Sequence, residues 1–155
     1  LETLEYIRHE TDTWLELTTL LIPGENDSEQ ELQAMTTWVV EHLGPDVPMH
    51  FTAFHPDWKM REHPNTAPAT LKMARAIAMA NGVRYAYTGN VRDPSGASTW
   101  CPGCGELLIE RDWYRLGRWG LDAAGCCGAC GASVPGVFDA RPDRLQTRPL
   151  RVKFD

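Results

Sequence analysis

Two short stretches, Cys-Pro-Gly-Cys-Gly at residues 101–105 and Cys-Gly-Ala-Cys-Gly at residues 127–131, decide how the C-terminal part of this sequence folds. Each Cys-x-x-Cys loop can bring two sulfur atoms to one metal ion, so two loops complete a tetrahedral set of thiolates. A glycine follows each pair because that position often needs a positive φ angle, which glycine adopts without a Cβ clash. The spacing therefore predicts a small zinc ribbon with four ligands, Cys101, Cys104, Cys127 and Cys130.

Two alternatives to zinc remain open from the spacing alone, a pair of disulfides and an iron-thiolate centre. Because four thiolates leave no coordination position for water, a structural metal is favoured over a catalytic one. Cys126 is left without a place in this set. All five cysteines fall between residues 101 and 130, whereas a secreted disulfide scaffold would spread them along the chain. The pattern therefore favours a reducing, cytoplasmic location.

Charge divides the chain into two parts. The net charge is −6, but residues 1–60 carry 12 acidic and 2 basic side chains, and residues 61–155 carry 9 acidic and 13 basic ones. An acidic first part argues against nucleic acid binding there. No apolar run reaches the length of a membrane span, so no membrane partner is expected. Residues 141–155 are interpreted as an extended, solvated basic tail containing Arg141, Arg144, Arg148, Arg151 and Lys153.

Helices and strands alternate along the first part of the sequence. The apolar spacing predicts helices over residues 1–7, 28–43 and 68–80, and strands over residues 14–22, 49–54 and 83–88. Ser28 and Glu31 have the spacing of a capping box at the start of the second helix. Such alternation predicts an α/β fold with parallel strands joined by right-handed crossovers.

Three parallel strands leave a sheet with open edges and uncovered faces, and a closed barrel needs about eight strands. We therefore expect residues 1–92 to be the C-terminal part of a larger (β/α) barrel whose other strands precede Leu1. The alternative is a self-contained three-stranded domain completed by dimerisation. Residues 93–140 are expected to form the zinc-ribbon module, with short strands over residues 107–110 and 113–116 and with Arg111 and Asp112 near the bend between them.

Four motifs, in this order, resemble the C-terminal portion of radical SAM enzymes of the AmmeMemoRadiSam system, which are similar to pyruvate formate-lyase activating enzymes. They are Leu-Thr-Thr-Leu-Leu-Ile-Pro-Gly-Glu-Asn-Asp at residues 17–27, Phe-Thr-Ala-Phe-His-Pro-Asp at 51–57, Tyr-Thr-Gly-Asn-Val at 87–91, and the closing Cys-Pro-x-Cys-Gly ribbon. The resemblance implies a (β/α) barrel that binds S-adenosylmethionine beside a [4Fe-4S] cluster and generates a 5′-deoxyadenosyl radical.

The sequence also departs from this family. The Cys-x3-Cys-x2-Cys run that holds the cluster and the Gly-Gly-Glu segment that receives the methionine end are not among these residues. We therefore expect the chain to be a C-terminal fragment of the enzyme, inactive without the N-terminal half of its barrel.

Few cofactor contacts can be carried over from the family. The resemblance places His55 at the end of a strand, near the bound S-adenosylmethionine, although His55 can equally cap a turn before Pro56. Thr18 stands where the relatives often carry an arginine on the inner face. Asn90 and Asp57 are weaker candidates at strand ends. The remaining histidines show no metal spacing and are interpreted as packing or surface residues: His9, His42, His50 and His63.

Two functional classes follow from the sequence. In the first, the chain is part of a radical enzyme, with a protein substrate or other proteins of the same system as possible partners. In the second, the ribbon is a binding module for protein or nucleic acid, and the α/β part is a scaffold. The only basic set of the ribbon is Arg111, Arg115 and Arg118, interleaved with Trp113, Tyr114 and Trp119.

Overall fold

The computed structural model describes residues 1–138 and divides the chain into two compact units, Leu1–Gly96 and a second unit that begins at Ala97. The predicted tail over residues 141–155, and the last residues of the module predicted over 93–140, lie outside the described residues. Each unit is described by itself.

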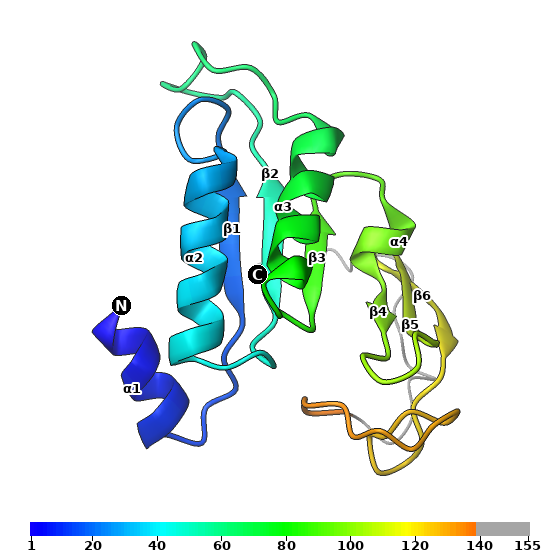
Figure 1. The fold of residues 1–155 in the computed structure, drawn as a ribbon. Helices are drawn as coiled ribbons and strands as arrows, with labels where there is room; N and C mark the ends of the chain where they lie inside the picture. The colour runs from blue at the N-terminus through cyan, green and yellow to red at the C-terminus, as the bar shows by residue number, and fades with distance from the viewer. Residues whose placement is uncertain (139–155) are drawn as a thin grey trace, which may run out of the picture. The chain divides into compact units, whose positions relative to one another are not determined.

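The first unit alternates helices and strands, as predicted (Figure 1). Its elements are α1 (Glu2–Glu10), β1 (Leu17–Leu21), α2 (Glu29–His42), β2 (Met49–Ala53), α3 (Pro68–Ala80) and β3 (Ala86–Gly89). The strands are parallel and lie in the order β1-β2-β3, with Leu17 opposite Met49 and Met49 opposite Ala86. The mixed α/β fold is therefore confirmed. The described strands form an open sheet, so the larger barrel stays a prediction.

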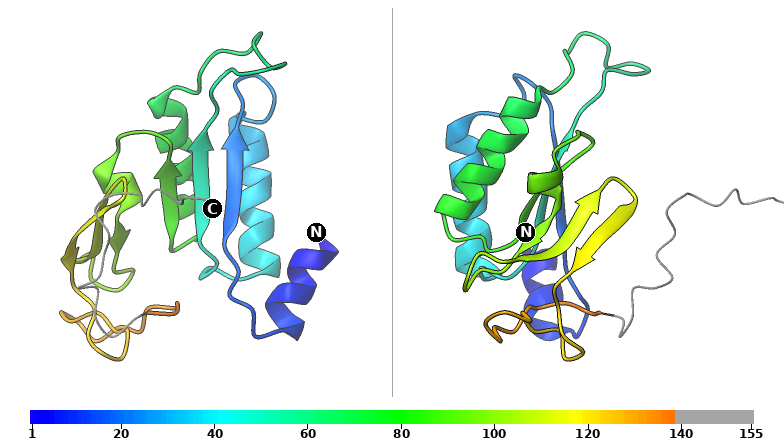
Figure 2. Two further views of the ribbon diagram at one scale, coloured as in Figure 1. Left: turned by 180° about the vertical axis from the view of Figure 1, so that it is seen from behind. Right: turned by 90° about the vertical axis from the view of Figure 1, so that its right-hand side faces the viewer.

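Helices α2 and α3 cover one face of this sheet (Figure 2). Alternate strand residues point to that face because side chains in a strand alternate with a period of two. Phe51 at the centre of β2 and Leu21 at the end of β1 are fully buried there. The helices contribute the other side of this core through Leu32, Val39, Leu71, Ala74 and Ala78.

The opposite face of the sheet carries polar and exposed side chains. Thr18 is exposed, and Leu20 keeps 44% of its surface accessible. On the neighbouring strand, His50 accompanies Thr18 and Thr52 accompanies Leu20 in the register. Parallel sheets are usually covered on both faces, whereas α2 and α3 cover only one face of this sheet.

Helix α1 is held on the end of α2 by polar contacts. The Arg8 Nε donates to the Leu43 carbonyl at 2.8 Å, and the His9 Nε2 lies 2.7 Å from the His42 carbonyl. The His42 Nδ1 in turn lies 2.7 Å from a Glu5 carboxylate oxygen. These contacts satisfy carbonyl groups that have no partner within α2 itself.

Three local predictions are refined. The Ser28 hydroxyl accepts from the Glu31 N–H at 3.3 Å, as predicted, but the Glu31 carboxylate accepts from that hydroxyl at 2.6 Å. The third strand begins at Ala86 and not at residue 83, because the Val83 N–H bonds the Ala78 carbonyl and completes the end of α3. The first strand is also shorter than predicted.

The second unit is a three-stranded antiparallel sheet, β4-β5-β6, preceded by the short helix α4 (Pro94–Ala97). Its strands are β4 (Thr99–Trp100), β5 (Leu107–Asp112) and β6 (Arg115–Trp119). Arg111 and Asp112 lie near the bend, as predicted, but both residues belong to β5, where the Arg111 N–H bonds the Ser98 hydroxyl and its guanidinium bonds the Thr99 hydroxyl. The bend itself is at Trp113 and Tyr114, so the strand predicted over residues 113–116 begins later, at Arg115.

None of the helices described within residues 1–138 combines the length and apolar character that crossing a bilayer requires.

Thr66 ties the loop after β2 to the end of β1. Its hydroxyl donates to the Leu21 carbonyl at 2.5 Å and accepts from the Phe54 N–H at 2.9 Å, and the residue is 5% exposed. One buried hydroxyl therefore satisfies two backbone groups at the carboxyl edge of the sheet.

We predict that Thr66→Val lowers the free energy of unfolding by about 2 to 4 kcal/mol, because two buried backbone groups lose their partner. Thr66→Ser is the matched control, which keeps the hydroxyl and costs about 1 kcal/mol for the lost methyl group. Urea denaturation of the metal-loaded chain measures both. Equal losses in the two variants would contradict the role assigned to the hydroxyl.

Asp93 lies near the C-terminal end of the first unit and is buried. Its carboxylate accepts from the Ser95 hydroxyl at 2.8 Å and the Thr88 hydroxyl at 3.2 Å. Burial of Asp93 raises its pKa, but the hydrogen bonds from Ser95, Gly96 and Thr88, together with the charge of Lys72, outweigh burial and leave the pKa below its ordinary value. A Cβ on Gly96 would lie 2.4 Å from both the Asp93 and Thr88 oxygens, so only glycine fits there.

A lowered pKa means that the Asp93 carboxylate stabilises the fold above its ordinary pKa of 3.8 and loses this contribution as the pH falls below it. We predict that the stability difference between the wild type and Asp93→Asn narrows as the pH is lowered through this range. Urea denaturation at a series of pH values measures the difference. A difference that is independent of pH would refute the prediction.

Candidate metal centre

The two Cys-x-x-Cys loops have the same backbone hydrogen bonds. In the first, the Gly105 N–H donates to the Cys101 carbonyl at 2.9 Å. In the second, the Gly131 N–H donates to the Cys127 carbonyl at 2.8 Å. Both glycines have φ of 74°, and a Cβ on either would meet no atom within 4 Å. The backbone conformation, and not a lack of space, therefore requires glycine, as the sequence predicted.

The first cysteine of each loop is also held in the same way. The Cys101 N–H donates to the Glu106 carbonyl, and the Cys127 N–H donates to the Ala132 carbonyl, each at 2.8 Å. Both loops are thus closed by a backbone bond across the turn. The cysteine side chains are directed by this closed backbone and not by neighbouring side chains.

The four predicted ligands converge. Their sulfur atoms all lie within 4.8 Å of one another, and the Cys101–Cys130 and Cys104–Cys127 sulfurs are 3.6 and 3.7 Å apart. Four sulfurs at about 2.3 Å from a zinc ion in tetrahedral geometry lie about 3.8 Å from one another. The described residues therefore form a four-cysteine site that can hold a metal ion such as zinc, and its geometry is compatible with a zinc ribbon.

Disulfides do not join these residues. All five cysteines are free thiols, and separations of 3.6 Å and more are far beyond the bond length of about 2.05 Å in a disulfide. Cys101 and Cys127 are buried, whereas Cys104 and Cys130 are exposed. Cys126 does not belong to the cluster, and its N–H donates to the Asp122 carboxylate.

Backbone N–H groups stabilise negative charge on the sulfurs. The N–H groups of Cys130 and Ala129 lower the pKa of Cys127 to about 7. The Glu106 N–H also lowers the pKa of Cys104, but the neighbouring Cys130 thiol, burial and the other thiols outweigh it and raise that pKa to about 12. A divalent metal ion supplies the positive charge that four converging thiolates need.

The predicted cofactor residues do not lie together. Thr18 is near the start of β1, opposite His50 in the register, and His55 follows the end of β2. His50 and His55 are five positions apart, which corresponds to about 16 Å along an extended chain. Thr18 and His55 are therefore well separated along the strand direction, and the role of each residue in cofactor binding stays a prediction.

The two weaker candidates lie at the carboxyl ends of the strands. Asn90 follows β3 with φ of 59°, and its side-chain amide donates to the Ala53 carbonyl at 3.4 Å. The Asp57 carboxylate accepts from the N–H of Trp58, so it stabilises a local turn. His55 itself is exposed.

Sequence reasoning missed a polar array on the open face of the sheet. The Glu16 carboxylate accepts from the Trp14 indole N–H and contacts the His50 Nε2, both at 2.8 Å. The His50 ring stacks on Tyr87 with centroids 5.0 Å apart. The period-two pattern of the strands was the available signal, because it places Glu16 on the same face as Thr18.

The chain is 40% identical over 122 residues to an uncharacterized protein, MJ0808, of Methanocaldococcus jannaschii. The match covers 78% of this chain but 37% of the relative, so the chain spans little more than a third of that protein. No family model matches the chain. No solved structure matches it either.

We predict that the chain binds one zinc ion and that Cys104→Ser abolishes stable binding, because a tetrahedral site that loses one thiolate loses much of its affinity. Cys126→Ser is the matched control and should retain the metal. Elemental analysis of the purified variants measures the metal content. A red protein, which absorbs visible light, would instead identify iron as the bound metal. Equal metal content in the Cys104→Ser and Cys126→Ser variants would exclude Cys104 as a ligand.

Proposed function

We propose that the complete protein is a radical S-adenosylmethionine enzyme of the AmmeMemoRadiSam type, with residues 1–92 as the last part of its (β/α) barrel. The observation that carries this proposal is the position of three motifs in the fold. Residues 17–27, 51–57 and 87–91 contain most of β1, β2 and β3, respectively, and each motif continues past the carboxyl end of its strand. The active sites of (β/α) barrels lie at this carboxyl edge of the strands.

The open face of the sheet supports the same assignment. In a barrel, one face of each strand packs on the helices and the other faces the interior. In the first unit, α2 and α3 cover one face, while Thr18, Leu20 and His50 lie on the other. Further strands of a barrel would enclose this second face.

The length of the M. jannaschii relative is consistent with a longer protein. Because the match covers 37% of that relative, a complete protein of similar size has room for additional strands. We propose that the cluster ligands and the segment that receives the methionine end lie in those additional residues. The ribbon of the second unit would then be a structural zinc module at the end of a cytoplasmic enzyme.

Reductive cleavage of S-adenosylmethionine beside a [4Fe-4S] cluster would supply a 5′-deoxyadenosyl radical, which abstracts hydrogen from a substrate. The contribution of this chain would be to bind and orient the cofactor. His55, exposed after β2, can donate a hydrogen bond to a carboxylate or ribose oxygen. Thr18 offers a hydroxyl on the inner face. A protein substrate, or other proteins of the same system, would be the partners.

The test uses the complete protein, purified and reconstituted without oxygen, with S-adenosylmethionine and a chemical reductant. We predict formation of 5′-deoxyadenosine, detected by mass spectrometry. His55→Ala should raise the KM for S-adenosylmethionine about tenfold, as expected for one lost hydrogen bond to a charged group. Tyr6→Ala, which removes an exposed ring from α1, is the control and should leave KM unchanged.

A cluster-containing protein that forms no 5′-deoxyadenosine would contradict the proposed chemistry. Normal turnover with an unchanged KM in His55→Ala would instead remove His55 from the cofactor site and leave the chemistry standing.

A second candidate function is a ribbon that carries recognition while the α/β unit acts as a scaffold. The exposed Trp113 and Tyr114 favour this candidate. The predicted basic set does not favour nucleic acid as its ligand. Arg111 bonds Thr99 within the ribbon, and Arg118 pairs with Glu106.

A further inference from the structure

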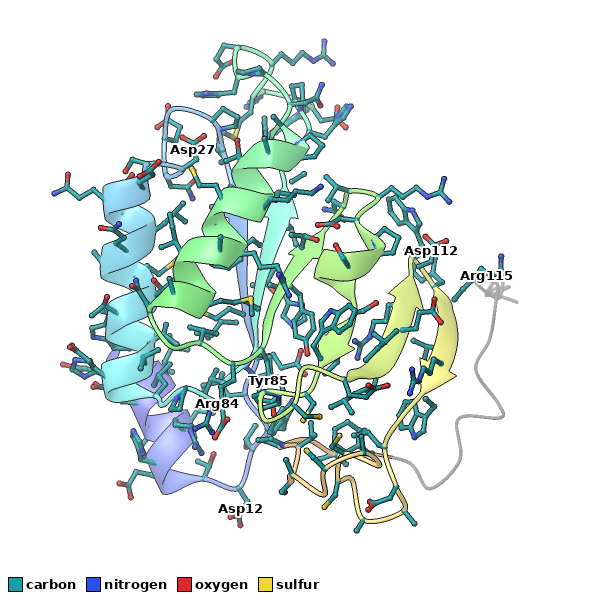
Figure 3. The ribbon with its side chains drawn as sticks, turned by 45° about the vertical axis from the view of Figure 1, so that its right-hand side comes forward. Asp12, Asp27, Arg84, Tyr85, Asp112 and Arg115 are labelled. Carbon is teal, nitrogen blue, oxygen red and sulfur yellow. The ribbon has the colours of Figure 1, made fainter. Side chains whose placement is uncertain are left out.

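The hairpin between β5 and β6 ends in two exposed aromatic residues. Asp112 pairs with Arg115 in the register, so Trp113 and Tyr114 alone form the connection. The side chains of Asp112 and Arg115 mark the ends of the two strands in Figure 3. Trp113 keeps 59% and Tyr114 keeps 71% of its surface accessible. We call Trp113 and Tyr114 the hairpin tip.

The residue types at the hairpin tip oppose its backbone conformation. Trp113 has φ of 55°, in the left-handed region. Tyr114, the second residue of the connection, is not among the residues with positive φ. A two-residue hairpin connection with positive φ at its first position alone favours glycine there, whereas a bulky side chain at that position is strained. Strained residues of this kind are concentrated at functional sites.

The ring contacts found among the described residues of the ribbon lie away from the hairpin tip. Trp119 packs edge-to-face on Phe138, with ring centroids 6.3 Å apart. Among residues 1–138, no ring contact or hydrogen bond involves the side chains of Trp113 or Tyr114. The fold of the ribbon therefore does not explain why two aromatic residues occupy this turn.

Charge near the hairpin tip distinguishes between classes of partner. Arg111 is turned inward to Thr99, and Arg118 pairs with Glu106. Arg115 is exposed and has no partner among the described residues. Residues 97–138 contain four acidic side chains and three arginines, and a zinc ion with four thiolates adds further negative charge. Nucleic acid binding needs a surplus of positive charge, which this unit does not have.

We propose that the hairpin tip is a protein-recognition element, which inserts the Trp113 and Tyr114 rings into an apolar recess of a partner protein. Arg115 pairs with a carboxylate at the rim of that recess. Tryptophan, tyrosine and arginine are the residues that most often dominate binding energy in protein interfaces. The proposal does not depend on the radical chemistry, because it concerns a surface of the ribbon alone.

The central variant is Trp113→Gly combined with Tyr114→Asn, made in the complete protein. It removes both rings and installs the residues that the turn prefers. We expect this double variant to retain its zinc and to unfold at the same temperature as the wild type or a few degrees higher. Zinc loss or a lower unfolding temperature would show that the rings stabilise the ribbon and would overturn the proposal.

Binding is measured in two steps. A photoreactive benzoylphenylalanine in place of Tyr114 identifies the protein that contacts the hairpin tip in cells, and that protein is then purified and titrated against each variant. We expect the double variant to bind at least about tenfold more weakly and Arg115→Glu to bind severalfold more weakly. Trp58→Asn is the matched control, because Trp58 is also an exposed tryptophan with positive φ, and it should bind normally.

Three other outcomes would overturn the proposal. Equal affinity of the wild type and the double variant would show that the rings are not used. Salt-dependent binding of a thymidine oligonucleotide that is lost in the double variant would identify nucleic acid as the ligand. Self-association that is lost in the double variant, measured by light scattering, would identify a second copy of the chain.

Discussion

Four cysteine sulfurs that converge within 4.8 Å hold together a sheet that buries few side chains. The apolar core of the ribbon consists mainly of Leu108, Ile109, Leu121 and Val134, together with the buried Cys101 and Cys127. A core of this size does not offset the conformational entropy of about forty ordered residues. A metal ion held by the four sulfurs would therefore contribute directly to the free energy of folding of β4, β5 and β6.

The first unit depends on burial and not on a metal ion. Its two longer helices and three strands share one apolar core, in which Phe51 and Leu21 are fully buried. Thr66 and Asp93 add buried hydrogen bonds near the carboxyl ends of the strands, where the loops change direction. The backbone at this edge is therefore well supported, while the side chains that project from it, such as His55, remain exposed.

Features set by near neighbours in the sequence could be predicted. The cysteine spacing predicted the four-sulfur cluster, and the positive φ of Gly105 and Gly131 followed from the geometry of a short loop. The alternation of predicted helices and strands indicated the parallel α/β unit. These predictions required no knowledge of contacts between distant parts of the chain.

Features that depend on register or on distant partners could not be predicted. The pairing of Glu16 with His50 joins residues 34 positions apart and requires the register of β1 on β2. The hairpin turns at Trp113 and not at Arg111, because Arg111 bonds Thr99 on a different strand. Local preference alone would not place a tryptophan at a position with positive φ.

The two cysteine loops match each other in their backbone hydrogen bonds and in the φ angle of the glycine that follows each pair. Exchanging Cys101 with Cys127 and Cys104 with Cys130 converts the 3.6 Å sulfur contact into the 3.7 Å one and preserves the order of buried and exposed residues. The side chains at the intervening positions differ, with Pro102 and Gly103 in one loop and Gly128 and Ala129 in the other. The similarity of the two loops is therefore a property of the peptide backbone. Duplication of a single ancestral loop would suffice to generate both halves of the four-cysteine site.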